Sequence, residues 1–152
     1  MTTVAWDGTI LAADTLIVDA HGLYEDVRKI FPGDYGLLAC AGCYAEALDL
    51  ARVMATEGSD CPVYEDLSAL WIRADHKGFR LITGTKTSSF LPLSRKFYAL
   101  GSGRDFALMA MHLGQSAIAA VQMTSHFDRY TSATVEAYTM QDGVAQRVKD
   151  LA

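Results

Sequence analysis

The sequence has no run of lysine or arginine residues, and its net charge at neutral pH is −5. A protein that follows the phosphates of a nucleic acid needs a basic surface, so this composition argues against nucleic-acid binding. The sequence also lacks an apolar stretch of the roughly 18 residues that a membrane span needs, and it does not open with the basic and apolar segments of a signal peptide. We therefore expect a cytoplasmic protein that does not contact a membrane.

Cysteine and histidine are also scarce. The three cysteines, Cys40, Cys43 and Cys61, are odd in number and follow no export signal, which predicts reduced thiols. Cys40 and Cys43 form a C-x-x-C pair, a pattern of redox sites and of half zinc sites, but the second pair of a zinc site is missing. The four histidines lack the spacing of metal ligands. The sequence therefore predicts neither a metal site nor a cofactor.

The size of the chain limits it to one domain. A length of 152 residues is enough for a substantial core but too short for two full domains, so residues 1–152 are expected to form a single unit. Hydrophobic residues make up 51% of the chain and charged residues only 20%. This apolar balance is consistent with surface that is buried between subunits.

The first residues predict a β-hairpin. Two alternating runs, Thr2–Trp6 and Thr9–Ala13, flank Asp7-Gly8, a dipeptide that favours a two-residue turn. Such a turn would pair positions whose numbers add up to 15, which places Thr2 opposite Ala13 and next to Asp14. A carboxylate is therefore expected near the start of the chain.

The rest of the chain alternates between strand and helix signals. A second hairpin with Lys29 in mid-strand is expected over residues 25–42. The helix at 44–56 is expected to stop at Gly58 and to place on one face Ala45, Leu48, Ala51, Arg52 and Ala55, with Leu50, Val53 and Met54 widening it. Strands separated by turns follow over residues 66–98. A strand ending at Gly101-Ser102-Gly103, two helices with Ser116 as a cap, and a strand at 131–140 complete the order. Segregated helices and mainly antiparallel strands predict an α+β fold, with two sheets and the helices outside.

Thr2 raises a chemical hypothesis. If Met1 is removed, Thr2 carries a hydroxyl nucleophile and a free amine, whose pKa of about 7.7 to 8.0 suits a base near neutrality. A nearby cation, a carboxylate and an amide donor for an oxyanion would complete such a site, and Lys29, Asp14 and Gly42 could supply them. Taken singly, each of these residues also has an ordinary structural reading: Thr2 as a strand residue, Lys29 as a strand lysine and Gly42 as a turn.

Five segments, taken together and in order, resemble the proteasome β-type and HslV-type peptidases, within the N-terminal-nucleophile hydrolases. They are "TTVAWDGTILAADT", "VRKI", "ACAGC", "ALGSGRDFALMAM" and "HFDRYTSATVEAYTM", and they span most of the chain. The resemblance implies a four-layer αββα sandwich of two mainly antiparallel sheets flanked by helices.

The resemblance also implies roles for individual residues. Thr2 would be both nucleophile and base, supported by Asp14 and Lys29, and Gly42 would donate its amide to the oxyanion. Cys40 would line the primary specificity pocket, as a small residue that leaves the pocket roomy. The residues that would complete the network around the Thr2 amine are Ser102, Asp128 and Thr131.

The expected activity is that of a threonine-type endopeptidase acting on peptides or unfolded proteins. The resemblance implies stacked homo-oligomeric rings of six or seven copies, and an ATPase unfoldase is a candidate partner. The sequence departs from the family pattern at Cys43, where a second glycine is usual, and at Thr131-Ser132-Ala133. A chain that retains Met1 would have no free Thr2 amine and should be inactive.

Two other readings remain open. Ser102, His126 and Asp128 could form a Ser-His-Asp triad, although Gly101-Ser102-Gly103 lacks the usual context of such a nucleophile. The alternative from another class is a catalytically inactive assembly or scaffold subunit that has kept the layered fold. The joint presence of the candidate catalytic residues favours the enzyme, because a scaffold needs none of them.

Overall fold

The strands of the computed structural model, which describes residues 2–56 and 60–149, form two five-stranded antiparallel sheets and a short hairpin. The first sheet has the order β10 (Tyr98–Gly101), β1 (Thr3–Trp6), β2 (Ile10–Asp14), β11 (Val135–Gln141) and β12 (Val144–Arg147). The second has the order β5 (Ile30–Gly33), β6 (Gly36–Gly42), β7 (Leu67–Ile72), β8 (Gly78–Thr83) and β9 (Ser88–Pro92). The hairpin consists of β3 (Ile17–Asp19) and β4 (Gly22–Tyr24).

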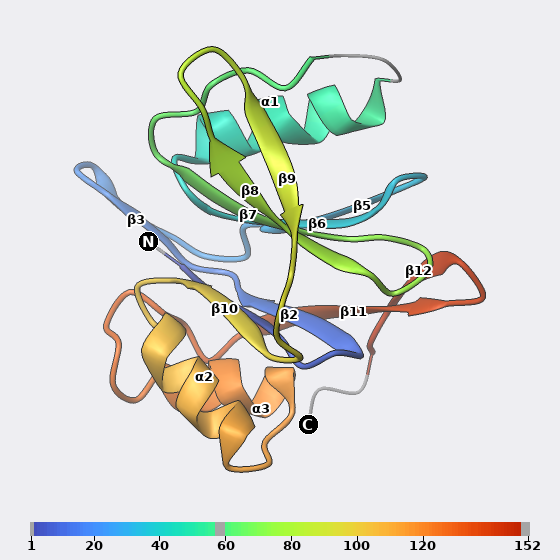
Figure 1. Cartoon of the computed structure of the whole chain (residues 1–152). Coiled ribbons are helices and arrows are strands. Elements are labelled where there is room, and N and C mark those ends of the chain that lie inside the picture. The colour runs from blue at the N-terminus through green and yellow to red at the C-terminus, as the bar shows by residue number, and fades with distance from the viewer. Residues whose placement is uncertain (1, 57–59, 150–152) are drawn as a thin grey trace.

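Helices cover one face of each sheet (Figure 1). Helix α1 (Tyr44–Ala55) packs on the second sheet, and α2 (Arg104–His112) and α3 (Ala117–Thr124) pack on the first. A third apolar cluster joins residues of both sheets, among them Trp6 and Leu11 of the first and Leu37 and Ile72 of the second. The expected combination of mainly antiparallel sheets and segregated helices is therefore confirmed. Within the described residues, no helix has the length and apolar character needed to cross a membrane.

The first hairpin forms, but its predicted register is wrong by two. The observed pairs are Val4 with Ala13, Ala5 with Ala12 and Trp6 with Leu11, so the numbers add up to 17. The turn is centred one residue later than expected, on Gly8 and Thr9, because the Asp7 carboxylate accepts the N–H groups of Thr9 and Ile10. Gly8 has a φ of 96°, which favours glycine. Continued along the strands, this register brings Thr3, and not Thr2, opposite Asp14.

The prediction for the buried face of helix α1 is confirmed for Leu50 and wrong for two other residues. Ala47, which was not expected on that face, is buried, whereas Leu48, placed on it from the sequence, is 43% exposed. Ala47 and Leu50 pack against Leu38 of the second sheet, with Met54 partly buried beside them. The predicted stop at Gly58 lies outside the described residues.

Two further differences concern strand boundaries. Strand β5 begins at Ile30, so Lys29 lies just before the strand and not in its middle. The chain also adds strand β12 after the turn at residues 141–143, paired with β11, where the sequence suggested no strand.

Candidate active site

The centre of the candidate site is a buried ion pair between Lys29 and Asp14. The Lys29 Nζ lies 2.9 Å from Asp14 Oδ1, and the two side chains are 2% and 0% exposed. The ammonium also donates to the carbonyl oxygen of Leu16. Asp14 accepts further N–H groups from Thr3, Leu16 and Ser132 at 2.9 to 3.2 Å. The carboxylate therefore ties the Lys29 ammonium to three separate stretches of main chain.

Burial affects the proton affinity of the Lys29 ammonium. Removal of the ammonium from water lowers the pKa of Lys29, and the opposing attraction of Asp14 does not fully restore it. Lys29 thus combines a fixed position with a proton that is held less tightly than that of a surface lysine.

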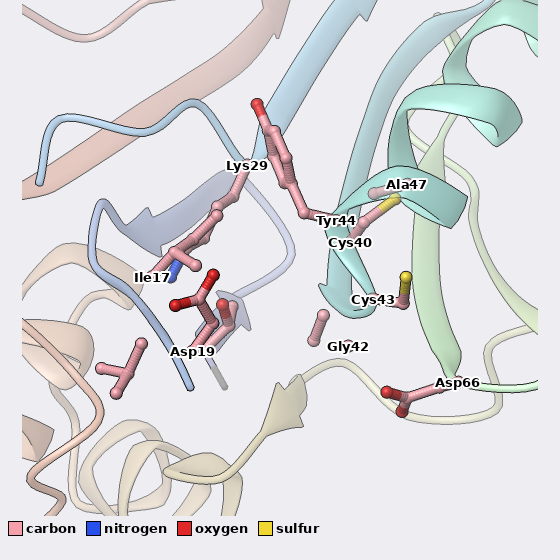
Figure 2. A pocket seen from close by; sticks show the side chains of 12 residues that line it. Ile17, Asp19, Lys29, Cys40, Gly42, Cys43, Tyr44, Ala47 and Asp66 are labelled. Carbon is pink, nitrogen blue, oxygen red and sulfur yellow. The ribbon is translucent and has the colours of Figure 1, made fainter. Parts of the chain in front are cut away.

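Thr2 lies in the same pocket as Lys29. The pocket has a volume of about 310 Å³, and its lining includes Thr2, Lys29, Gly42 and Cys40. Figure 2 shows Asp66 well away from Lys29, with Gly42 between them in this view. A neighbouring pocket shares Thr2 and Gly42 and adds Ser102. Thr2 therefore lies where the two pockets meet.

The three remaining predicted residues form a second cluster. The Ser102 hydroxyl donates to Asp128 Oδ2 at 2.6 Å, and the Thr131 hydroxyl donates to the same oxygen at 2.7 Å. Thr131 also shares a hydrogen bond with the hydroxyl of Thr3 at 2.6 Å. Burial by itself raises the pKa of the Asp128 carboxyl, but these hydroxyls and the Tyr130 N–H outweigh burial, so its pKa lies below the ordinary value.

The Gly101-Ser102-Gly103 segment brings this cluster against the start of the chain. Gly101 has a φ of 91°, and a Cβ added there would lie 1.7 Å from the carbonyl oxygen of Thr2. A Cβ on Gly103 would lie 2.2 Å from the Thr3 hydroxyl. Both glycines are therefore needed for β10 to pair with β1 and for α2 to begin beside it.

Gly42 and its neighbours close the opposite wall of the pocket. Gly42 has a φ of 113°, and a Cβ there would lie 2.3 Å from the carbonyl oxygen of Asp66. The next residue, Cys43, donates its N–H to the same carbonyl at 2.6 Å and precedes helix α1. The departure from a second glycine at position 43 is accommodated, since the Cys43 φ of −66° suits any residue.

The cysteines of the C-x-x-C pair are free, as is Cys61. Burial raises the pKa of the Cys40 thiol to about 12. Within the described residues, no group of three or more His, Cys, Asp and Glu side chains could hold a metal ion. Cys40 lines the pocket as an uncharged thiol, as expected for a small lining residue.

The pKa of Cys40 gives a testable prediction. At pH 8, iodoacetamide should leave Cys40 unmodified under conditions that alkylate the partly exposed Cys43, because the thiolate is the reactive form. Peptide mapping by mass spectrometry would measure both sites, and the same reaction in denaturant should alkylate Cys40 fully. Equal alkylation of the two cysteines in the folded protein would contradict the burial of Cys40.

No protein-family model matches the chain, and no curated protein matches it. A solved structure does match its fold. BPH of Thiobacillus denitrificans, in complex with epoxomicin, is similar with a TM-score of 0.66 over 92% of this chain and 98% of that one. The sequence identity is 18%, so the likeness concerns the fold alone.

The structure brings the residues predicted from the sequence around two adjoining pockets and one polar cluster, and it adds three neighbours that the sequence analysis missed. Thr3 links Asp14 to Thr131, Asp66 lines both pockets, and Glu136 accepts the main-chain N–H of Lys29. Glu136 was detectable in principle, because it occupies the same strand face as the buried Tyr138. The triad reading loses support, since Ser102 donates directly to Asp128 and His126 is exposed.

Proposed function

We propose that the chain is a threonine-type endopeptidase of the proteasome β and HslV type, with Thr2 as its N-terminal nucleophile once Met1 is removed. The observation that carries the proposal is the position of Thr2. It lines one pocket with the Lys29 of the buried ion pair and with Gly42, and a second with Ser102, which is bonded to Asp128. The hydroxyl of Thr2 thus has a cation in one adjoining pocket and a hydrogen-bonded polar cluster at the other, which supports this chemistry.

The proposed reaction is acyl transfer. Thr2 Oγ1 attacks the carbonyl carbon of the scissile peptide bond, and the Thr2 amine takes the hydroxyl proton and passes it to the leaving amine. The Gly42 amide stabilises the oxyanion, and the Lys29 ammonium stabilises negative charge on the attacking oxygen. Water then hydrolyses the ester, which returns the proton to Thr2 and releases the acid. No metal or cofactor takes part in these steps.

The packing of helices and sheets supports the proposal. Helix α1 packs on the second sheet, helices α2 and α3 pack on the first, and an apolar cluster joins the two sheets, so we propose that the fold is a four-layer αββα sandwich of the N-terminal-nucleophile hydrolase type. The similar structure, BPH, was solved with epoxomicin bound. We propose that the present chain likewise accepts peptide-like ligands in the pocket beside Thr2.

The proposal extends to assembly into homo-oligomeric rings of six or seven copies, with peptides or unfolded proteins as substrates and an ATPase unfoldase as a candidate partner. Helices α2 and α3 expose an apolar surface that contact with a second copy would bury. Its members are Phe106, Met109, Leu113, Met123 and Phe127. Arg104, Asp105 and Arg129 place charges of both signs near this surface, which suits contact between two copies of one chain.

The decisive experiment is intact mass spectrometry before and after incubation with a peptide epoxyketone, a reagent directed at N-terminal threonine. We expect a chain without Met1 that gains one adduct, with the modified peptide containing Thr2. Native mass spectrometry of the same sample would give the number of copies in the assembly. A chain that lacks Met1 and gains no adduct would contradict the proposal. A chain that assembles with Met1 retained and gains no adduct would favour the inactive scaffold subunit.

A further inference from the structure

Glu136 is a buried carboxylate that the reaction above does not use. It lies in β11, and its side chain is on the strand face of Tyr138 and Met140, whose side chains fill the core between the two sheets. Only 5% of Glu136 is exposed. A carboxylate in such a place is costly unless its oxygens are hydrogen-bonded, so its partners indicate why it is there.

The partners of Glu136 are the main-chain N–H groups on either side of the Lys29 carbonyl. Glu136 Oε1 accepts the N–H of Lys29 and, at 2.8 Å, the N–H of Ile30. The Lys29 carbonyl in turn accepts the N–H of Cys40 at 3.1 Å. The main chain of Lys29 is therefore held between β11 of the first sheet and β6 of the second.

The charged side chains that act on the Lys29 ammonium are carboxylates. Asp14 on β2, Glu136 on β11 and Asp128 in the loop before β11 all favour its ammonium form. Arg28 and Arg147, both exposed, act on Glu136 from the outside, and the hydroxyl of Tyr44 on α1 lies within the field of Glu136. Burial raises the pKa of Glu136, while its two N–H partners and the two arginines oppose that rise.

We propose that Glu136 is a positioning residue for Lys29, fixing the main chain from which the ammonium reaches Asp14 and supplying part of the negative charge that keeps the ammonium protonated. The effect of this positioning on catalysis rests on the proposed peptidase function. The effect of Glu136 on the charge of Lys29 does not depend on that function, so positioning and charge can be measured separately.

The effect of Glu136 on the charge of Lys29 is tested by NMR titration of the lysine ¹³Cε signals. The Lys29 signal is assigned as the one that is missing from the spectrum of Lys29→Arg. Glu136→Gln keeps an oxygen that can accept both N–H groups but removes the charge, so the Lys29 midpoint should fall to a lower pH than in the wild type. Glu46→Gln is a control for the loss of one carboxylate charge elsewhere in the chain; Glu46 accepts the main-chain N–H groups of Glu65 and Asp66, one on each oxygen, so this variant also gives up one of those hydrogen bonds. It should leave the Lys29 midpoint unchanged.

The role of Glu136 in positioning Lys29 is tested by measuring, over a range of pH, the rate at which the peptide epoxyketone labels Thr2. In Glu136→Gln, the loss of reactivity at alkaline pH should begin at a lower pH than in the wild type, by the same amount as the shift of the Lys29 midpoint. Glu136→Asp keeps the charge, but its side chain is one methylene shorter and cannot reach both N–H groups. It should therefore label several-fold more slowly at every pH while its Lys29 midpoint stays near that of the wild type.

The outcomes separate the two proposals. An unchanged Lys29 midpoint in Glu136→Gln would overturn the role of Glu136 in keeping Lys29 charged, and wild-type labelling rates in Glu136→Asp would overturn its role in positioning. Should Glu136→Gln not fold, the labelling rate of Glu136→Asp still decides the positioning role. A wild-type chain that lacks Met1 and is not labelled would refute the peptidase, while the NMR midpoints would still show whether Glu136 sets the charge of Lys29.

Discussion

Thr2→Ala should lower the rate of fluorogenic peptide cleavage by a factor of about 10³ or more, because the variant keeps the N-terminal amine but has no hydroxyl to attack the carbonyl. Thr2→Ser keeps both groups and should retain measurable cleavage. Alanine, serine and threonine are all small enough for removal of the initiator Met. Intact mass would confirm that the three proteins begin at residue 2, so that only the hydroxyl differs between them.

A remote threonine provides the matched control for this substitution. The Thr139 hydroxyl donates to the carbonyl oxygen of Thr9 at 2.9 Å, at the far end of β11 from the pocket. Thr139→Ala should cleave the peptide at the wild-type rate. Undiminished cleavage by Thr2→Ala would refute Thr2 as the nucleophile and direct attention to Ser102 or to a contaminating peptidase.

Lys29→Met should lower the free energy of unfolding by about 3 to 5 kcal/mol, the usual effect of removing one partner of a buried ion pair. The Asp14 side chain is fully buried, so the variant leaves its charge compensated only by main-chain N–H groups. Urea denaturation at neutral pH, followed by circular dichroism, would measure the loss. The variant should also lose labelling of Thr2, because it removes the cation that we propose stabilises negative charge on the Thr2 hydroxyl oxygen.

An exposed ion pair in the same chain is a control that distinguishes the effect of burial on stability from the effect of losing a charge. Arg73 and Asp75 lie 3.2 Å apart, and their side chains are 45% and 41% exposed. Arg73→Met should lower the free energy of unfolding by less than about 1 kcal/mol, since water screens an exposed pair. Similar losses in Lys29→Met and Arg73→Met would contradict a structural role for the buried pair.

Local signals in the sequence predicted much of the fold. The Asp7-Gly8 turn, the Gly101-Ser102-Gly103 junction and the Ser116 cap each depend on a few adjacent residues, and each lies close to its expected place. The Ser116 side chain accepts the Ala119 N–H, as a helix cap should. The candidate site was predicted through its order of motifs, and the structure places those residues around adjoining pockets and a shared polar cluster.

One error is local: the register of the first hairpin is set by which N–H groups the Asp7 side chain accepts, those of Thr9 and Ile10. The other errors concern features that depend on distant parts of the chain, such as the buried face of α1, which is set by the sheet beneath it. Glu136 contacts the main chain of Lys29 only because the fold places β11 beside Lys29, which lies more than a hundred residues earlier in the chain. A contact between residues so far apart cannot be predicted from a local sequence pattern. The one local signal was a charged residue on an otherwise apolar strand face.

The close approach of Gly101 to the carbonyl oxygen of Thr2 has a consequence for the timing of maturation. Thr2 is only 4% exposed, and its carbonyl oxygen is packed against Gly101, so the pairing of β10 with β1 encloses Thr2. At translation rates of about 5 to 20 residues per second, the residues of β10 leave the ribosome roughly 5 to 20 s after Thr2. For a peptidase of the proposed kind, we expect Met1 to be removed during this interval, before β10 is available to pair with β1 and enclose Thr2.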